Sequence, residues 1–326
     1  MYAKACGIIG KSFVGRGLAR LGPVTRLSEL DRLVFPENPR DLPERELLVD
    51  LESRLALRAA DRIGKVIDSF SKPPEFLVRL LRAYEYSDVK SCLNALIAGE
   101  TQAPAHTGLG EFTTVTFAAY PDLRGMFRDS EFAWLCGETL SEATSESIQS
   151  KLDSRYYSAL WKAMGQLAKK DRIAIEGILR EEISLRNAAW ALRLRTYYGM
   201  DGEAIRERLI SIEPAGPPTD TLAVASLSLA LDNRGEWQKW KAEGLLNPER
   251  PGEAWKVDPR YFQNAAAAHL YRMTYHALRR RPFSLDTAAC FIKLMLFEED
   301  YLTSVAEGLS LGMTAPDVFA ILEAQP

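Results

Sequence analysis

The sequence predicts an all-α protein built from repeated helical units. Two segments, residues 70–99 and 283–312, follow one pattern without a gap at a distance of 213 residues. Their shared apolar positions step by three and four residues, which is the spacing of one face of a helix. Both segments end in glycine, which commonly adopts the left-handed conformation that terminates a helix. Strand patterns are nearly absent, so we expect helices throughout.

A less similar third copy lies between these two segments. Residues 177–199 again place apolar residues at steps of four and three, and aligning them needs an insertion of about one residue. The copies recur at roughly 100–115 residues, which is too long for the common short helical repeats. We therefore expect three similar helical repeats in residues 1–110, 111–215 and 216–326. The repeat positions are Tyr84, Glu85, Gly99, Asn187, Gly199, Phe297, Glu298 and Gly312.

The chain before the first repeat is expected to form further helices. Residues 1–20 could begin with a helix, although four glycines weaken it. Residues 25–33 have the pattern of a short helix, and the prolines after them indicate a turn-rich connector. Pro43 suits a helix start, so residues 44–70 are predicted to form one long amphipathic helix.

The segment after the first repeat is the least helical part of the sequence. The prolines and glycines of residues 101–125 indicate a loop, to which residues 113–117 could contribute a short strand. A helix is expected near residues 130–137. Residues 141–170 have a longer helical pattern, with Ser141 as a suitable N-cap.

The last third of the sequence begins with a linker. Residues 213–220, EPAGPPTD, have linker composition, and residues 233–260 are irregular and polar enough to form an exposed insertion. Trp237 and Trp240 alternate with lysines there, a pattern that can stack on nucleic acid. Without a wider basic surface, we interpret them as packing on a core or contacting a partner. A helix over residues 261–281 and two final helices should complete the chain.

The composition is that of an ordinary globular protein. The 326 residues are 47% hydrophobic and 26% charged, and the net charge is −3. A dedicated nucleic-acid binder would carry a basic surplus, so we expect no nucleic-acid partner. The apolar residues 221–231 are too few to span a bilayer, and no signal peptide is recognised. We expect a cytoplasmic protein, or one attached to a membrane through another protein.

Four scattered cysteines indicate a reducing compartment: Cys6, Cys92, Cys136 and Cys290.

A loose phosphate-loop pattern occurs near the N-terminus. Residues 5–12, ACGIIGKS, have the required glycine, lysine and serine. Such a loop needs a strand before it and a helix after it, so that backbone N–H groups surround the phosphate. Only four residues precede the pattern, and no strand ending in a magnesium-binding Asp follows it. We therefore interpret these residues as a kinked first helix.

Glu85 and Glu298 lie in the middle of apolar helix faces, where a carboxylate must be paired or hydrogen-bonded. One interpretation is a proton-handling acid whose pKa is raised by burial. The other is a structural acid that binds an arginine or backbone N–H groups of a neighbouring segment. Recurrence at matched positions in two copies favours the structural interpretation.

Other residues that could carry chemistry have no suitable partners in the sequence. His269 and His276 could share a helix face, but only Cys290 is near enough in sequence to act as a third metal ligand. His106 has no recognisable nucleophile partner. Residues 298–300 form an acidic run, whose members point in different directions on a helix, and residues 279–281 suit a helix C-terminus. We expect no catalytic, cofactor or metal site.

At the repeat segments the chain resembles the C subunit of bacterial and archaeal V/A-type ATPases, called subunit d in eukaryotic V-ATPases. The resemblance is carried by residues 79–100, 178–205 and 282–313 and covers most of residues 70–326. Members of this family show a Glu-x-x-Asn-Leu-like core ending in glycine in each of three repeats. Asn187 keeps the asparagine, whereas the first and third repeats have other residues there: Asp88 and Tyr301.

This resemblance implies a non-catalytic subunit that couples the two rotating parts of a V/A-type ATPase. In such proteins, three helical units form a funnel-like body on the cytoplasmic side of the membrane rotor ring. The central cavity receives the end of the central shaft, so rotation linked to ATP hydrolysis or synthesis passes to the ring, which moves protons or sodium ions. The implied partners are the shaft subunits and the ring. The alternative is a helical-repeat scaffold or adaptor unrelated to ATPases, and an all-α synthase would need Asp-rich magnesium motifs that the sequence does not show.

Overall fold

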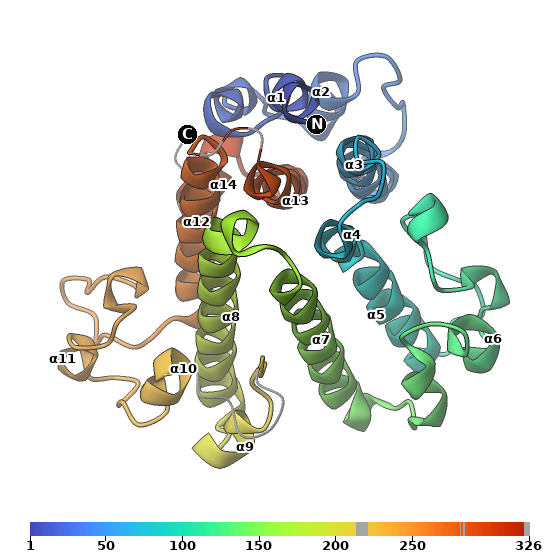
Figure 1. Ribbon diagram of the computed structural model, residues 1–326. Coiled ribbons are helices and arrows are strands. Elements are labelled where there is room, and N and C mark those ends of the chain that lie inside the picture. The colour runs from blue at the N-terminus through green and yellow to red at the C-terminus, as the bar shows by residue number, and fades with distance from the viewer. Residues whose placement is uncertain (213–220, 281, 283, 323–326) are drawn as a thin grey trace.

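The computed structural model describes all residues except 213–220, 281, 283 and 323–326, and every regular element in the described residues is a helix (Figure 1). The α-helices are α1 (Tyr2–Ile9), α2 (Leu27–Val34), α3 (Glu44–Ile67), α4 (Glu75–Leu81), α5 (Ala83–Ile97), α6 (Leu123–Phe127), α7 (Glu142–Gly165), α8 (Lys169–Tyr198), α9 (Gly202–Arg206), α10 (Thr221–Ser226), α11 (Arg234–Trp237), α12 (Pro259–Leu278), α13 (Leu285–Ser310) and α14 (Ala315–Leu322). The 3₁₀ helices are η1 (Gly15–Leu21), η2 (Gly110–Phe112), η3 (Phe117–Ala119), η4 (Ala133–Gly137) and η5 (Glu243–Leu245).

Helix α13 is the centre of the packing. It contacts α3, α12, α8, α4 and α14, as well as the N-terminal helices α1 and α2. Most of its turns are buried on more than one side, as expected for a helix whose apolar residues are not confined to one stripe. The largest apolar cluster therefore forms around α13 and includes parts of α3, α4, α7, α8 and α12.

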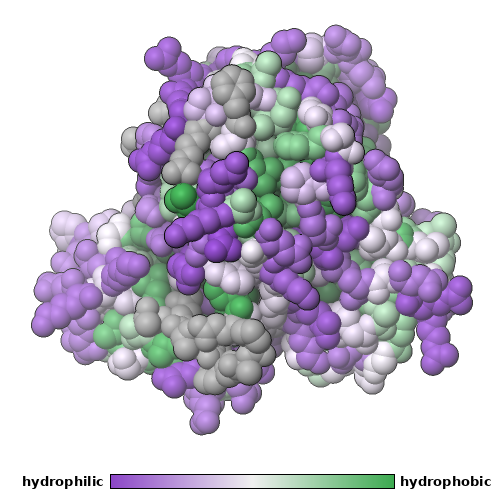
Figure 2. Space-filling view, in the orientation of Figure 1, coloured by the Kyte–Doolittle hydropathy of each residue, from purple (hydrophilic) through white to green (hydrophobic). Residues whose placement is uncertain are grey.

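Two repeat segments continue from this central cluster into smaller clusters of their own. Helix α5 extends into a cluster with α6, η4 and the start of α7, and α8 extends into clusters with α9–α12. Figure 1 shows these as two separate lower groups of helices, with α5 and α7 in one and α8 and α12 in the other. On the face seen in Figure 2, green apolar residues lie between purple hydrophilic ones.

The three repeat segments end as their glycines predict. Gly99, Gly199 and Gly312 have φ values of 76°, 59° and 79°, in the left-handed region that favours glycine. The first segment is divided into α4 and α5 at Arg82, whereas the third is the continuous α13. The third begins at Phe283, which lies outside the described residues, as does the predicted linker 213–220.

Several predicted elements differ from the structure at their boundaries or in type. The first helix stops at Gly10, and residues 15–21 form η1. Residues 113–116, considered for a strand, are irregular and lie between η2 and η3, because backbone N–H groups there bond to carbonyls of the same region or to Glu85. The helix predicted over 130–137 is the short η4, and the 141–170 pattern divides before Lys169 into α7 and α8. Ser141 caps α7, with its side chain accepting from Thr144 N at 3.3 Å.

The interpretation of Trp237 and Trp240 as packing on a core is confirmed, so these two residues are not part of the exposed surface predicted for residues 233–260. Trp237 and Trp240 are 0% and 6% exposed, pack edge-to-face against each other and lie in one cluster with residues of α8 and α12. Their indole N–H groups donate to Ala230 O at 2.7 Å and to Leu222 O at 3.0 Å. Both indole N–H groups therefore have hydrogen-bond partners, which allows the two tryptophans to be buried.

No helix within the described residues combines the length and apolar character needed to cross a bilayer. Helix α10 packs on α8, so residues 221–226 share contacts with the preceding repeat helix. The proposed repeat boundaries at 110/111 and 215/216 stay a prediction.

Candidate functional site: charged contacts of the repeat helices

Polar and charged side chains from three long helices meet around Glu182 of α8. Lys293 of α13 forms an ion pair with Glu182, and the hydroxyl of Tyr157 on α7 donates to Glu182 Oε1 at 2.9 Å. Burial acts to raise the pKa of Glu182, but the Lys293 ammonium, the nearby Arg186 and the hydrogen bonds outweigh it and lower that pKa. One carboxylate therefore links α7, α8 and α13.

The same charged region continues along α13. Asp300 is exposed to water, yet the surrounding protein raises its pKa to about 6, against the opposing effect of Arg186. Burial also raises the pKa of Glu299 to about 7, although a hydrogen bond from Tyr84 of α5 favours its charged form. The Arg186 guanidinium lies 5.3 Å from the centre of the Tyr157 ring. We call these residues the charged centre: Tyr84, Tyr157, Glu182, Arg186, Lys293, Glu299 and Asp300.

The charged centre has members on α5, α7, α8 and α13, and therefore on all three repeat segments. It is mixed in sign, and its contacts include the Lys293–Glu182 ion pair and the hydrogen bonds of the two tyrosines to Glu182 and Glu299. These contacts hold α5, α7, α8 and α13 in register. The charged centre shows no pairing of a nucleophile with a base, which acyl-transfer chemistry requires.

Glu85 binds the backbone of the loop that follows its own repeat helix. Its carboxylate accepts from the N–H groups of Thr114 and Val115, the latter at 2.9 Å, and from the Thr114 hydroxyl at 3.1 Å. One turn later Asp88 accepts from Thr107 N at 2.9 Å, and burial raises the pKa of Asp88 to about 7. These two acids fasten residues 107–115 to α5.

Asn187 makes a comparable contact in the second repeat segment. Its side-chain amide donates to Ile210 O at 3.0 Å and accepts from Ile210 N at 2.8 Å. Asn187 is 1% exposed, so both bonds lie in the interior. They fasten the chain beyond α9 to α8. Tyr301, at the corresponding position of α13, is also buried, and its hydroxyl has no hydrogen-bond partner within the described residues.

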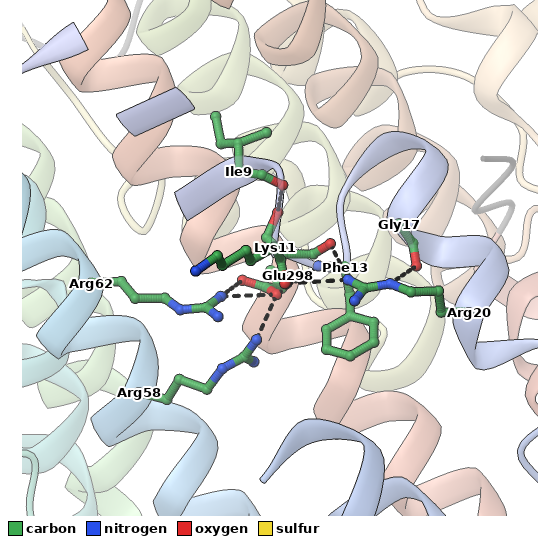
Figure 3. A network of polar contacts seen from close by, with 9 residues as sticks. Ile9, Lys11, Phe13, Gly17, Arg20, Arg58, Arg62 and Glu298 are labelled. Carbon is green, nitrogen blue, oxygen red and sulfur yellow. Dashed lines mark hydrogen bonds and ion pairs between the residues drawn. The ribbon is translucent and has the colours of Figure 1, made fainter. Parts of the chain in front are cut away.

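Glu298 binds the N-terminal segment instead of a loop that follows it (Figure 3). Its Oε1 accepts from Phe13 N at 2.7 Å and from Arg58 at 3.1 Å, and its Oε2 accepts from Arg62 at 2.8 Å. The two arginines are one turn apart on α3. Burial lowers the pKa of Arg58 to about 10, and Arg62 lowers it further while Glu298 opposes the change. The N-terminal segment makes a second contact nearby, where Gly15 N donates to the Tyr271 hydroxyl at 2.6 Å.

The geometry favours the structural interpretation of Glu85 and Glu298, because each carboxylate is occupied by backbone N–H groups or arginines. The structure does not bring Glu85, Asn187 and Glu298 together; each has its own partner segment. Tyr84 does reach α13, where it meets Glu299. Phe297 packs against the rings of Tyr271 and Tyr301.

The residues of the phosphate-loop pattern form α1 and a turn, with no strand before them. The N–H groups of Lys11 and Ser12 donate to the carbonyls of Ile8 and Ile9. The next N–H, of Phe13, points at the Glu298 carboxylate (Figure 3). The anion held by this turn is therefore the protein's own side chain.

The histidines are dispersed. His269 Nε2 lies 3.5 Å from Glu181 Oε1, His276 contacts the Tyr275 ring, and His106 stacks on Phe117. The part of the chain that the structure describes contains no group of three His, Cys, Asp or Glu residues placed to hold a metal ion. Of the basic run 279–281, Arg281 lies outside the described residues, and Arg279 donates to the Tyr275 hydroxyl at 2.6 Å.

Sequence reasoning missed the cationic partners of these acids. Arg58 and Arg62 are spaced four apart on a predicted helix, as are Glu182 and Arg186. That spacing places each pair on one helix face, which is the available signal. It does not reveal the partner helix, because 236 residues separate Arg62 from Glu298.

The fold within the described residues is all-helical, and ion pairs join its long helices. A family model described as "ATP synthase (C/AC39) subunit" matches residues 41–317. The chain therefore belongs to the C/AC39 subunit family of V/A-type ATP synthases. It is also 26% identical over 321 residues to an uncharacterized protein from Treponema pallidum (strain Nichols), a match that covers 96% of this chain and 92% of that protein.

Proposed function

We propose that this protein is the non-catalytic subunit that couples the central shaft of a V/A-type ATPase to its membrane rotor ring. The family match over residues 41–317 is the observation that carries the proposal. The proposed partners are the shaft subunits and the ring, and the proposed location is the cytoplasmic face of the membrane. Rotation passed by this subunit would connect ATP hydrolysis or synthesis to proton or sodium transport.

The fold supports this role through its stiffness. A coupler must transmit torque without deforming, and closely packed protein interiors are nearly incompressible. Helix α13 joins α3, α8 and α12 in one core, and the charged centre adds an ion pair between α8 and α13. A funnel of three repeats would place these helices around the shaft.

The test is purification of a tagged chain from its native membranes, followed by identification of the proteins that accompany it. We expect shaft and ring subunits in constant proportion. Deleting the gene should leave ATP hydrolysis by the catalytic subunits but abolish ATP-driven ion uptake into membrane vesicles. A chain that purifies with other partners and leaves ion uptake intact would instead be a scaffold unrelated to the ATPase.

A further inference from the structure

The N-terminal residues concentrate positive charge in a protein that is negative overall. Residues 1–34, which we call the basic cap, contain six Lys or Arg and two Asp or Glu, whereas the whole chain has a net charge of −3. The cap therefore has a surplus of four positive charges, and the remaining residues have a surplus of seven negative ones. Charge asymmetry of this kind indicates interaction with an anionic partner.

The basic cap is one layer at one end of the molecule. Helices α1 and α2 lie together at the top of Figure 1, above α3 and α13. All six cationic side chains of the cap are exposed: Lys4, Lys11, Arg16, Arg20, Arg26 and Arg32. The family match begins at residue 41, so the cap lies before the matched region.

The two acids of the cap do not neutralise this surface. Asp31 is 1% exposed and is paired with Arg54 of α3 at 2.8 Å. Glu29 is paired with Arg26 of the cap at 2.7 Å. The other five cap cations make no ion pair within the described residues, so their charges face water uncompensated: Lys4, Lys11, Arg16, Arg20 and Arg32.

The layer beneath the cap adds positive charge. Arg58 and Arg62 share the single carboxylate of Glu298, which leaves one guanidinium charge in excess. Arg20 lies over the Phe13 ring at 4.2 Å and Arg58 lies 5.5 Å from the same ring, so a third guanidinium is close (Figure 3). The packing of the cap therefore concentrates cations that have too few internal partners.

The character of this surface distinguishes a membrane from a protein partner. The large hydrophobic side chains that are exposed begin at Leu42, so the described cap offers none. Protein interfaces are centred on aromatic and aliphatic anchors. Adsorption to anionic lipid needs only charge, and each Lys or Arg near such a surface strengthens binding about fivefold. We propose that the basic cap adsorbs to the phosphate groups of an anionic phospholipid surface without inserting into it.

The test is co-sedimentation of the full chain with vesicles of phosphatidylcholine, alone or with about 30% phosphatidylglycerol. We expect at least tenfold stronger binding to the anionic vesicles, lost in about 0.5 M salt because charges are screened beyond a few ångströms. The variant K4Q/K11Q/R16Q/R32Q should lose at least tenfold in affinity. It spares Arg20, which packs on Phe13, and unchanged circular dichroism will verify its fold.

The matched control K72Q/K239Q/K241Q/R260Q removes the same charge from exposed residues outside the cap. It should stay within about twofold of the unsubstituted chain. An equal loss in both variants would show that net charge alone matters and would overturn the proposal. Equal binding to both vesicle types would also overturn the proposal. Binding to soluble polyglutamate without binding to anionic vesicles would overturn it too and would indicate an acidic protein partner. Inorganic phosphate should compete no better than chloride at equal ionic strength; stronger competition would indicate a free-anion site instead. None of these outcomes depends on the rotor-coupling role.

Discussion

Replacing Glu298 by glutamine removes one charge from the most highly connected acid of the fold. The Glu298 side chain is 2% exposed and accepts from Phe13 N, Arg58 and Arg62. Breaking a buried ion pair by removing one partner typically costs about 3–5 kcal/mol, because the other charge is left uncompensated. Arg58 and Arg62 keep 13% and 17% of their side chains exposed, which allows some hydration. We therefore expect the free energy of unfolding to fall by about 3 kcal/mol, the lower end of that range.

The assay is urea unfolding at neutral pH, followed by circular dichroism and by fluorescence of the tryptophans. The matched control is Glu307→Gln, which removes the same charge from an exposed position on α13 and should change stability by less than about 0.5 kcal/mol. Adding Arg58→Met and Arg62→Met to Glu298→Leu should recover part of the loss, because no buried charge then lacks its partner. Equal stability of Glu298→Gln and Glu307→Gln would refute the reasoning.

Three further predictions concern other buried contacts. Asn187→Ala leaves both polar backbone atoms of Ile210 unpaired and should cost about 3 kcal/mol, with faster hydrogen exchange at that amide. The surrounding protein raises the pKa of the Asp300 side chain from 3.8 to about 6, although that side chain reaches water. The folded state therefore holds a proton that the unfolded state releases, so the stability that this group contributes is lost as pH rises from about 4 to about 6. Asp300→Asn should therefore gain stability relative to the unsubstituted chain across that window, and a parallel pH profile would contradict this. Gly64 lies within α3 with open space around it, so Gly64→Ala should stabilise the protein by about 1 kcal/mol. Gly15→Ala should destabilise the protein, because φ of Gly15 is 55° and the added Cβ would lie 2.5 Å from a tyrosine hydroxyl. Thermal melting of both variants measures the contrast.

The sequence predicted local features more reliably than partners. Helical spacing, the Ser141 cap and the glycine stops at Gly99, Gly199 and Gly312 depend on nearby residues, and the structure shows all of them. The interpretation of Trp237 and Trp240 as core residues is confirmed, whereas the polar composition of residues 233–260 does not reveal the backbone carbonyls that accept from their indole N–H groups. Burial of such residues depends on a surface supplied by α8 and α12, which composition does not report.

The identity of each acid's partner is the information that local patterns lack. The same apolar spacing surrounds Glu85 and Glu298, yet one binds a loop 29–30 residues later and the other binds Phe13, 285 residues earlier. Helix α13 is followed by the short helix α14, whereas α5 is followed by the loop that Glu85 binds. The N-terminal segment supplies the backbone N–H instead. The first residues of the chain thereby tie α3 to α13, and we expect loss of Glu298 to loosen the basic cap as well as the core, which hydrogen exchange at the Phe13 and Gly15 amides would detect.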